Sequence, residues 1–74
     1  MRSLRYIASE ALPRILDRQG YKTSAIAREL GLSRSYLSLI VKGKRPLGED
    51  LARRIAQFVR LPVDILFMTE EEPS

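Results

Sequence analysis

The chain has 74 residues, which is enough for one small domain but not for two, so enzymes built from two lobes are excluded. Three of its nine acidic residues are Glu70, Glu71 and Glu72, so residues 1–69 hold all 13 Lys and Arg against six acids, an excess typical of a nucleic-acid-binding domain. The sequence contains no His and no Cys, which excludes disulfides, imidazole and thiolate metal sites, cysteine nucleophiles and Ser-His-Asp triads.

The spacing of the apolar residues predicts an all-α fold. These residues recur every three or four positions, with almost no alternation of period two. The first predicted helix covers residues 4–18 and carries an apolar stripe from Leu4 to Leu16. Pro13 lies inside it, where it removes a backbone hydrogen bond and clashes with the preceding turn. We therefore expect a kink or break near residues 11–13.

The next two predicted helices are short and are joined by a three-residue turn. One covers residues 23–30 and stops at Gly31, a residue that readily adopts the left-handed conformation of a helix cap. The other covers residues 34–42 and is opened by Ser33, whose hydroxyl can accept a hydrogen bond from a free backbone N–H. Two short helices around such a turn are typical of a DNA-binding helix-turn-helix.

Two further helices are predicted after the helix-turn-helix. One covers residues 49–59, where acidic residues in the first turn complement the helix dipole. The other is a last short helix that begins at Pro62. We expect a single folded domain over residues 1–68, followed by a short acidic C-terminal tail over residues 69–74.

Basic residues concentrate in the helix-turn-helix segment. Between Lys22 and Arg45 there are six basic residues and one acidic residue, Glu29. A basic run is often no more than the solvated surface of helices. Here, however, Arg34 begins the third predicted helix, where its side chain can enter a DNA groove, and Lys42, Lys44 and Arg45 lie at its end, where they can bind phosphates.

Several short pieces of the sequence together resemble a known family. They are IARELGLSRSYLS from Ile26 to Ser38, then Gly43-Lys44-Arg45, Leu51 with Ile55-Ala56, and Asp64 before Leu66. In this order they resemble the lambda-repressor-like, or Cro/CI-type, helix-turn-helix regulators over residues 12–67. The resemblance implies a compact five-helix domain with the helix-turn-helix at about residues 23–42, whose second helix is the recognition helix.

The resemblance also implies which residues meet DNA. The implied base-reading residues are Arg34, Ser35, Ser38 and Leu39, and the implied backbone-binding residues are Thr23, Ser33, Tyr36, Lys42, Lys44 and Arg45. Arg34 could bond to two acceptors of a guanine, and Leu39 could pack on a thymine methyl. The alternatives are a phosphate contact or solvation for Arg34, packing in the core or on a dimer partner for Leu39, and packing in the core for Tyr36.

Two departures from the family pattern bear on local structure. Thr23 stands where the family usually has Gln, and Lys22 where it has a capping Ser, so the second helix could begin one residue later with Thr23 as its cap. Arg60 stands where Gly often ends the fourth helix. In a left-handed conformation Arg60 would store roughly 1 kcal/mol of strain.

From these residues we expect a sequence-specific regulator that binds double-stranded DNA, in particular a phage or bacterial repressor on a palindromic operator. One small domain covers only part of such a site, so we expect a homodimer, with Leu47, Phe67 and Met68 as candidate contacts. The alternative is an antitoxin or adaptor that uses the same fold to bind a protein.

Other classes of function are not expected. Carboxylates, Lys and Tyr are the available acid-base groups, and no convergent arrangement of them is visible, so we expect no enzyme. No apolar run approaches the roughly 18 residues that a membrane span needs. We therefore expect a cytoplasmic protein with no cofactor, metal, small-molecule ligand or membrane partner.

Overall fold

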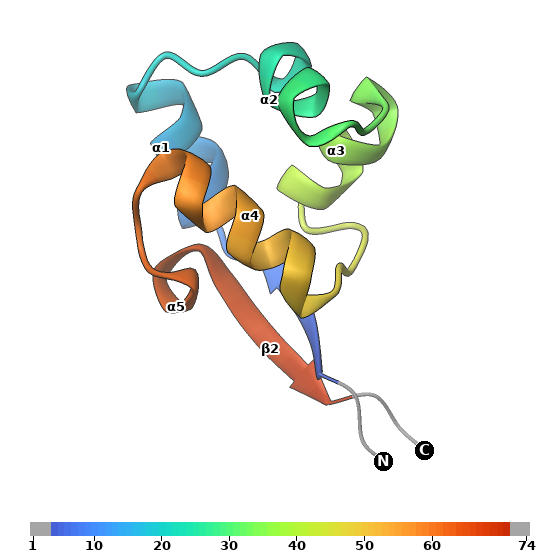
Figure 1. The fold of residues 1–74 in the computed structure, drawn as a ribbon. Coiled ribbons are helices and arrows are strands. Elements are labelled where there is room, and N and C mark those ends of the chain that lie inside the picture. The colour runs from blue at the N-terminus through green and yellow to red at the C-terminus, as the bar shows by residue number, and fades with distance from the viewer. Residues whose placement is uncertain (1–3, 72–74) are drawn as a thin grey trace.

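The computed structural model describes residues 4–71, which form five helices and a small sheet (Figure 1). In chain order the elements are β1 (Leu4–Ala8), α1 (Ala11–Arg18), α2 (Thr23–Leu30), α3 (Arg34–Val41), α4 (Glu49–Val59), α5 (Val63–Leu66) and β2 (Phe67–Glu71). The α2–α3 pair lies at one end of the molecule and β2 at the other, with α4 between them. The prediction of five helices is confirmed, but the prediction of an all-α fold is only partly right, because β1 and β2 form an antiparallel pair.

The N-terminal segment is a strand where the sequence predicted a helix. The backbone of Tyr6 pairs with that of Leu47, donating a hydrogen bond of 2.8 Å and accepting one of 2.9 Å. On its other side β1 pairs with β2, so that Tyr6 lies opposite Thr69 and Ala8 opposite Phe67. Tyr6 and Ala8 are buried, as expected for alternate residues of a half-buried strand. The helical prediction for this segment is wrong because both partners that make it a strand lie far away in the sequence.

The break expected around Pro13 is the beginning of α1. The helix begins at Ala11, so Pro13 is its third residue, where the missing N–H would have had no acceptor within the helix. Ser9 holds this start in place, because its carbonyl oxygen accepts from the Leu12 N–H at 3.2 Å and its hydroxyl from the Ala11 N–H at 3.3 Å. Pro13 therefore neither ends a helix nor causes a kink in one.

The C-terminal end of the chain adds a strand to the fold. Thr69 and the two residues after it continue β2 and pair with β1, where the sequence predicted a tail from residue 69; residues 72–74 of that tail lie outside the described residues. Phe67 begins β2 and is only 3% exposed, and Leu47 is equally buried. Both side chains pack in the core of a single chain, which corrects their assignment as dimer contacts. Met68, the third candidate, is 58% exposed.

The core draws its largest buried side chains from all five helices. These are Leu12 of α1, Ile26 of α2, Leu37 and Ile40 of α3, Ile55 of α4 and Leu66 of α5. Hydrogen bonds from the Ser9 N–H to the Leu66 oxygen (2.8 Å) and from the Ser9 hydroxyl to the Ile65 oxygen (3.0 Å) fasten α5 to the segment between β1 and α1. Because Leu37 and Ile40 belong to this core, α3 packs on it by its inner side and leaves its outer side exposed to solvent.

Arg60 ends α4 in the left-handed conformation that the sequence allowed for, with φ 62° and ψ 41°. Replacing Arg60 by Gly should raise the free energy of unfolding by up to about 1 kcal/mol, because glycine adopts this conformation without a Cβ clash. Urea denaturation measures the change. As a control, Gln57→Gly on the exposed side of α4 should lower the free energy of unfolding by roughly 0.5–1 kcal/mol. A loss of stability in Arg60→Gly would contradict the strain.

Candidate nucleic-acid interface

A tight turn fixes α3 against α2. The Leu32 N–H donates to the Ala27 oxygen at 2.8 Å and the Gly31 N–H to the Arg28 oxygen at 3.3 Å, the paired bonds of a Schellman motif. Gly31 has φ 71°, which glycine adopts at little cost. The left-handed end that the sequence predicted for this helix is thus confirmed, and the turn sets the angle at which α3 leaves α2.

Ser33 caps α3, as predicted. Its hydroxyl oxygen accepts a hydrogen bond of 3.1 Å from the Tyr36 N–H. At the start of α2, by contrast, the helix begins at Thr23 with Lys22 as its cap residue, so the later start with Thr23 as cap is not found. Thr23 is instead the first residue of the helix, with its side chain half-buried.

The outer side of α3 brings together several of the residues predicted to meet DNA. Arg34 and Ser35 are exposed and Ser38 is half-buried, while Leu37 and Ile40 on the other side of the helix are buried. A cleft of about 270 Å³ is lined by Arg34, Ser35, Ser38 and Thr23. Three predicted base readers and one predicted backbone contact therefore share one surface, although they come from two helices.

Leu39 lies outside this cleft. Its side chain is 39% exposed, so it does not pack in the core of the chain. A leucine offers no hydrogen bond, and its exposed position after Ser38 leaves it free to make an apolar contact with a base or a protein.

Three basic residues lie directly after the C-terminal end of α3. Lys42, Lys44 and Arg45 are all exposed. The loop that carries them is held to α3 and to β1. The Lys44 N–H donates to the Leu39 oxygen of α3 at 3.0 Å, and Gly43 lies against β1. A Cβ on Gly43 would come within 3.2 Å of the Ala8 oxygen, and its φ of 73° also disfavours other residues. The three basic side chains therefore project from a loop whose conformation is fixed by these contacts.

Tyr36 lies beneath one of these cations. The Cζ atom of Arg45 is 5.3 Å from the centre of the Tyr36 ring, within the range of a cation–π interaction. Tyr36 is half-buried, and its ring packs against the core, which was the alternative considered for this residue. The same ring also lies against Arg45 at the surface. Together with Lys44 and Arg45 it lines a cleft of about 640 Å³.

Arg5 of β1 lines the same cleft, and the sequence prediction missed it. A helix over residues 4–18 gave no reason to place Arg5 beside the loop after α3. The signal was tertiary, since it depends on the pairing of Tyr6 with Leu47.

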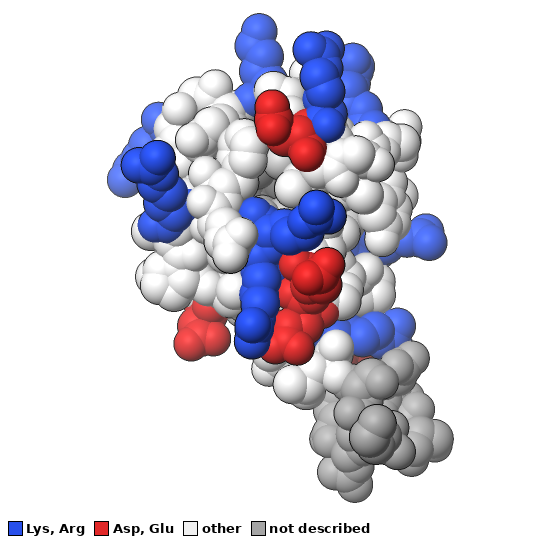
Figure 2. Space-filling view, viewed as in Figure 1, with Lys and Arg blue, Asp and Glu red and all other residues white. Residues whose placement is uncertain are grey.

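Basic side chains are prominent at the end of the molecule that carries the helix-turn-helix. In Figure 2 they project from the end that carries α2 and α3, with an acidic group among them, and further basic and acidic side chains lie beside each other lower on the same face. Away from the helix-turn-helix, Arg53 is paired with Glu49 on α4 at 2.8 Å. A surface of exposed cations around one helix is suited to a polyanion.

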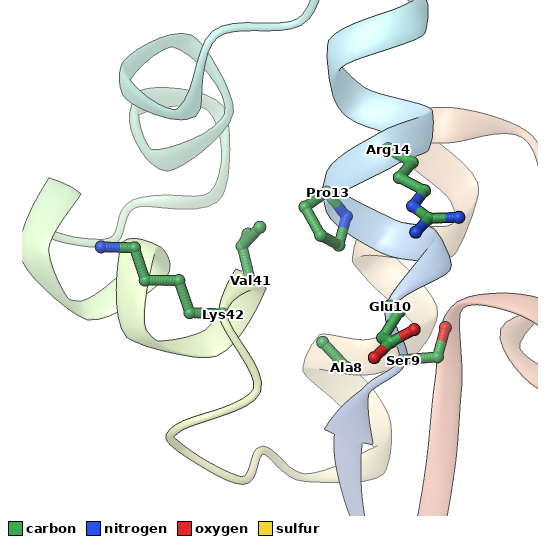
Figure 3. Close-up of a pocket in the computed structure, with 7 residues that line it drawn as sticks. All are labelled: Ala8, Ser9, Glu10, Pro13, Arg14, Val41 and Lys42. Atoms are coloured by element: carbon green, nitrogen blue, oxygen red, sulfur yellow. The ribbon is translucent and has the colours of Figure 1, made fainter.

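A third cleft lies between the start of α1 and the end of α3 (Figure 3). It has a volume of about 320 Å³, and Val41 and Pro13 point toward each other across it. The Ser9 hydroxyl at its edge is already bonded to backbone groups, and the side chain of Lys42 extends away. The Ser9 hydroxyl thus donates to a backbone oxygen and not to a side chain of this cleft.

Two other kinds of site are not found among residues 4–71. No group of three or more metal-ligating side chains is close enough to hold an ion, and no helix has both the length and the apolar character to span a bilayer.

Comparison with known proteins gives the family. A helix-turn-helix family model matches residues 14–66, which run from α1 through α5 and include the whole α2–α3 unit. Searches of the curated proteins and of the solved structures returned no match. The family is one of DNA-binding regulatory domains rather than of enzymes. By its sequence match and its α2–turn–α3 surface, the chain belongs to the lambda-repressor-like, Cro/CI-type helix-turn-helix family.

Proposed function

We propose that the protein is a sequence-specific transcription regulator of the Cro/CI repressor type, of phage or bacterial origin, that acts in the cytoplasm by occupying a promoter. The observation that carries the proposal is the cleft on the outer side of α3, where Arg34, Ser35 and Ser38 meet Thr23 of α2. Exposed cations follow directly after the same helix. An α-helix fits the major groove of B-DNA, so α3 can enter it by this side while the core holds the other.

The side chains of α3 divide into readers and anchors by their chemistry. Arg34 can donate two parallel hydrogen bonds to O6 and N7 of guanine, and the serine hydroxyls can bond to bases or phosphates. Leu39 fits a thymine methyl. Thr23, Lys42, Lys44 and Arg45 bind the backbone on either side of the groove and so set the position of α3.

The proposal includes a homodimer on a palindromic operator. Two copies related by a twofold axis read half-sites about one helical turn apart. Since Leu47 and Phe67 belong to the core, Met68 is the member of the predicted set that is available for the contact. Ile65, 49% exposed, lies three residues before it and adds apolar surface. Sedimentation with and without operator DNA, on wild type and Met68→Lys, tests whether this surface joins the two copies.

Replacing Lys44 by Ala should weaken binding to every duplex alike, because a phosphate contact carries no sequence information. The slope of log K against log salt concentration should fall by about 1, the share of one phosphate contact. Fluorescence anisotropy over a salt series measures both quantities. Arg54→Ala, an exposed arginine of α4, is the matched control and should change the slope less. A Lys44 variant with an unchanged slope would remove this residue from the interface.

The proposed function itself is tested by selecting duplexes from a random pool and comparing the winner with a scrambled duplex. The proposal predicts a palindromic winner, stronger binding to it, and a steep loss of affinity with salt. If the protein bound both duplexes equally weakly, the regulator proposal would fail, and an antitoxin or adaptor that binds a protein would take its place.

A further inference from the structure

A basic cleft extends from α3 to β1, beyond the two helices of the helix-turn-helix. Its volume is about 640 Å³, and its charged lining residues are Arg5 of β1 and Lys44 and Arg45 of the loop after α3. Tyr36 of α3 forms part of its wall. Three cations from two separate segments therefore surround one hollow on the flank of α3.

The backbone pair between β1 and the loop builds this cleft. Tyr6 and Leu47 exchange hydrogen bonds of 2.8 and 2.9 Å, an isolated bridge that fastens the loop to the strand. The bridge places Arg5, the residue before Tyr6, next to the loop cations. On the other side the Lys44 N–H bonds to the Leu39 oxygen at 3.0 Å, so the cleft is tied to α3 as well.

The ring of Tyr36 supports the guanidinium of Arg45. The ring centre lies 5.3 Å from Cζ of Arg45, and the ring itself packs on the core. An arginine held on an aromatic face loses less side-chain freedom when it binds an anion than one that moves freely in solvent. Tyr36 is therefore placed to orient Arg45 rather than to reach DNA with its own hydroxyl.

We propose that this cleft binds one phosphodiester group of the DNA backbone when α3 lies in the major groove, with Tyr36 as the residue that positions Arg45. The inference rests on the proposed function and extends the interface from the helix-turn-helix to β1. Glu70 lies directly opposite Arg5 in the strand pair, so the charge of Arg5 acts beside a carboxylate. We therefore expect Lys44 and Arg45 to supply the larger share of the attraction, and Glu70→Gln to bind DNA more tightly than wild type.

A double-mutant cycle tests the role of Tyr36. Tyr36→Phe keeps the ring and should bind the selected duplex within twofold of wild type, whereas Tyr36→Leu should bind about two- to fivefold more weakly. Arg45→Gln should weaken binding and lower the salt slope by about 0.9. In the Arg45→Gln background, Tyr36→Leu should cause no further loss, because the cation that it supports has gone.

The outcomes of this cycle separate positioning from other roles. If Tyr36→Phe were as weak as Tyr36→Leu, the hydroxyl would contact DNA and the positioning role would be wrong. If Tyr36→Leu cost the same with and without Arg45, Tyr36 would act independently of Arg45, and the positioning role would be wrong. Thermal unfolding of each variant without DNA checks that the compared proteins are folded.

Arg5 variants test whether β1 takes part in the cleft. Arg5→Gln should weaken binding to selected and scrambled duplexes alike and lower the salt slope, Arg5→Lys should retain the slope, and Arg54→Gln on α4 is the control for loss of a distant charge. An unchanged slope in Arg5→Gln would overturn the cleft while leaving the proposed function standing. Failure of the wild type to bind any duplex would overturn both.

Inorganic phosphate distinguishes DNA from a free anion as the occupant. Only a weak, non-saturating response of the Tyr36 and Arg45 NMR signals is expected at millimolar phosphate. Saturable binding at low-millimolar phosphate would assign the cleft to a free anion and contradict the proposal.

Discussion

Replacing Arg34 by Ala should weaken binding to the selected duplex by roughly 1–3 kcal/mol, or about 5- to 150-fold, and should relax the preference at one base pair of each half-site. Arg34 is exposed at the first turn of α3 and lines the cleft shared with Ser35 and Ser38. Its guanidinium can make two hydrogen bonds to one guanine, and their loss leaves the acceptors of that base unpaired. Affinities for duplexes that vary at each position measure the effect.

The selected and scrambled duplexes distinguish a base contact from a phosphate contact by Arg34. A base contact predicts a large loss on the selected duplex and a small loss on the scrambled one. Lys44→Ala provides the opposite pattern, because it should weaken both equally. Equal losses on both duplexes for the Arg34 variant would show that Arg34 binds phosphate or is merely solvated, which were the alternatives for this residue.

Replacing Leu37 by Ala should lower the free energy of unfolding by about 2–5 kcal/mol. Leu37 is 1% exposed on the inner side of α3, and its truncation leaves a cavity in a core that is close-packed. A domain of this size is stabilised by only about 4–11 kcal/mol in total, so the variant should be partly unfolded near physiological temperature. Urea denaturation and thermal unfolding measure the loss.

Leu39→Ala is the matched control, because it makes the same substitution two residues further along the same helix. Leu39 is 39% exposed, so the change should cost less than about 1 kcal/mol of stability and should act instead on DNA binding. Equal destabilisation by the two substitutions would mean that α3 does not present its Leu39 side to solvent, and the orientation of the recognition helix would be wrong.

Local rules were sufficient to predict where α2 ends and α3 begins. Gly31 and Ser33 mark the end of α2 and the start of α3 by hydrogen bonds that involve only neighbouring residues. Because Ser33 fixes the start of α3, the helical period then places Arg34, Ser35 and Ser38 away from the buried Leu37. The family resemblance implied these three residues as base readers, and the helical period explains why they share the outer side of α3.

Tertiary pairing explains what the sequence did not reveal. Leu4, Ile7 and Ala8 satisfy a helical spacing as well as they fit a strand, and the choice is made by partners at Leu47 and in β2. Burial of Leu47 and Phe67 follows from the same pairing. The cleft lined by Arg5, Lys44 and Arg45 could not be predicted from the sequence for the same reason, because it forms only when β1 lies beside the loop after α3.

Backbone NMR signals of the ¹⁵N-labelled protein, followed while the selected duplex is added, test the orientation of the protein on DNA most directly. The account predicts that the largest changes fall on Arg34, Ser35 and Ser38 of α3, with further changes at Thr23 and in the loop that carries Lys44 and Arg45. Large changes confined to α1, α5 or β2, with the signals of α3 left in place, would contradict it.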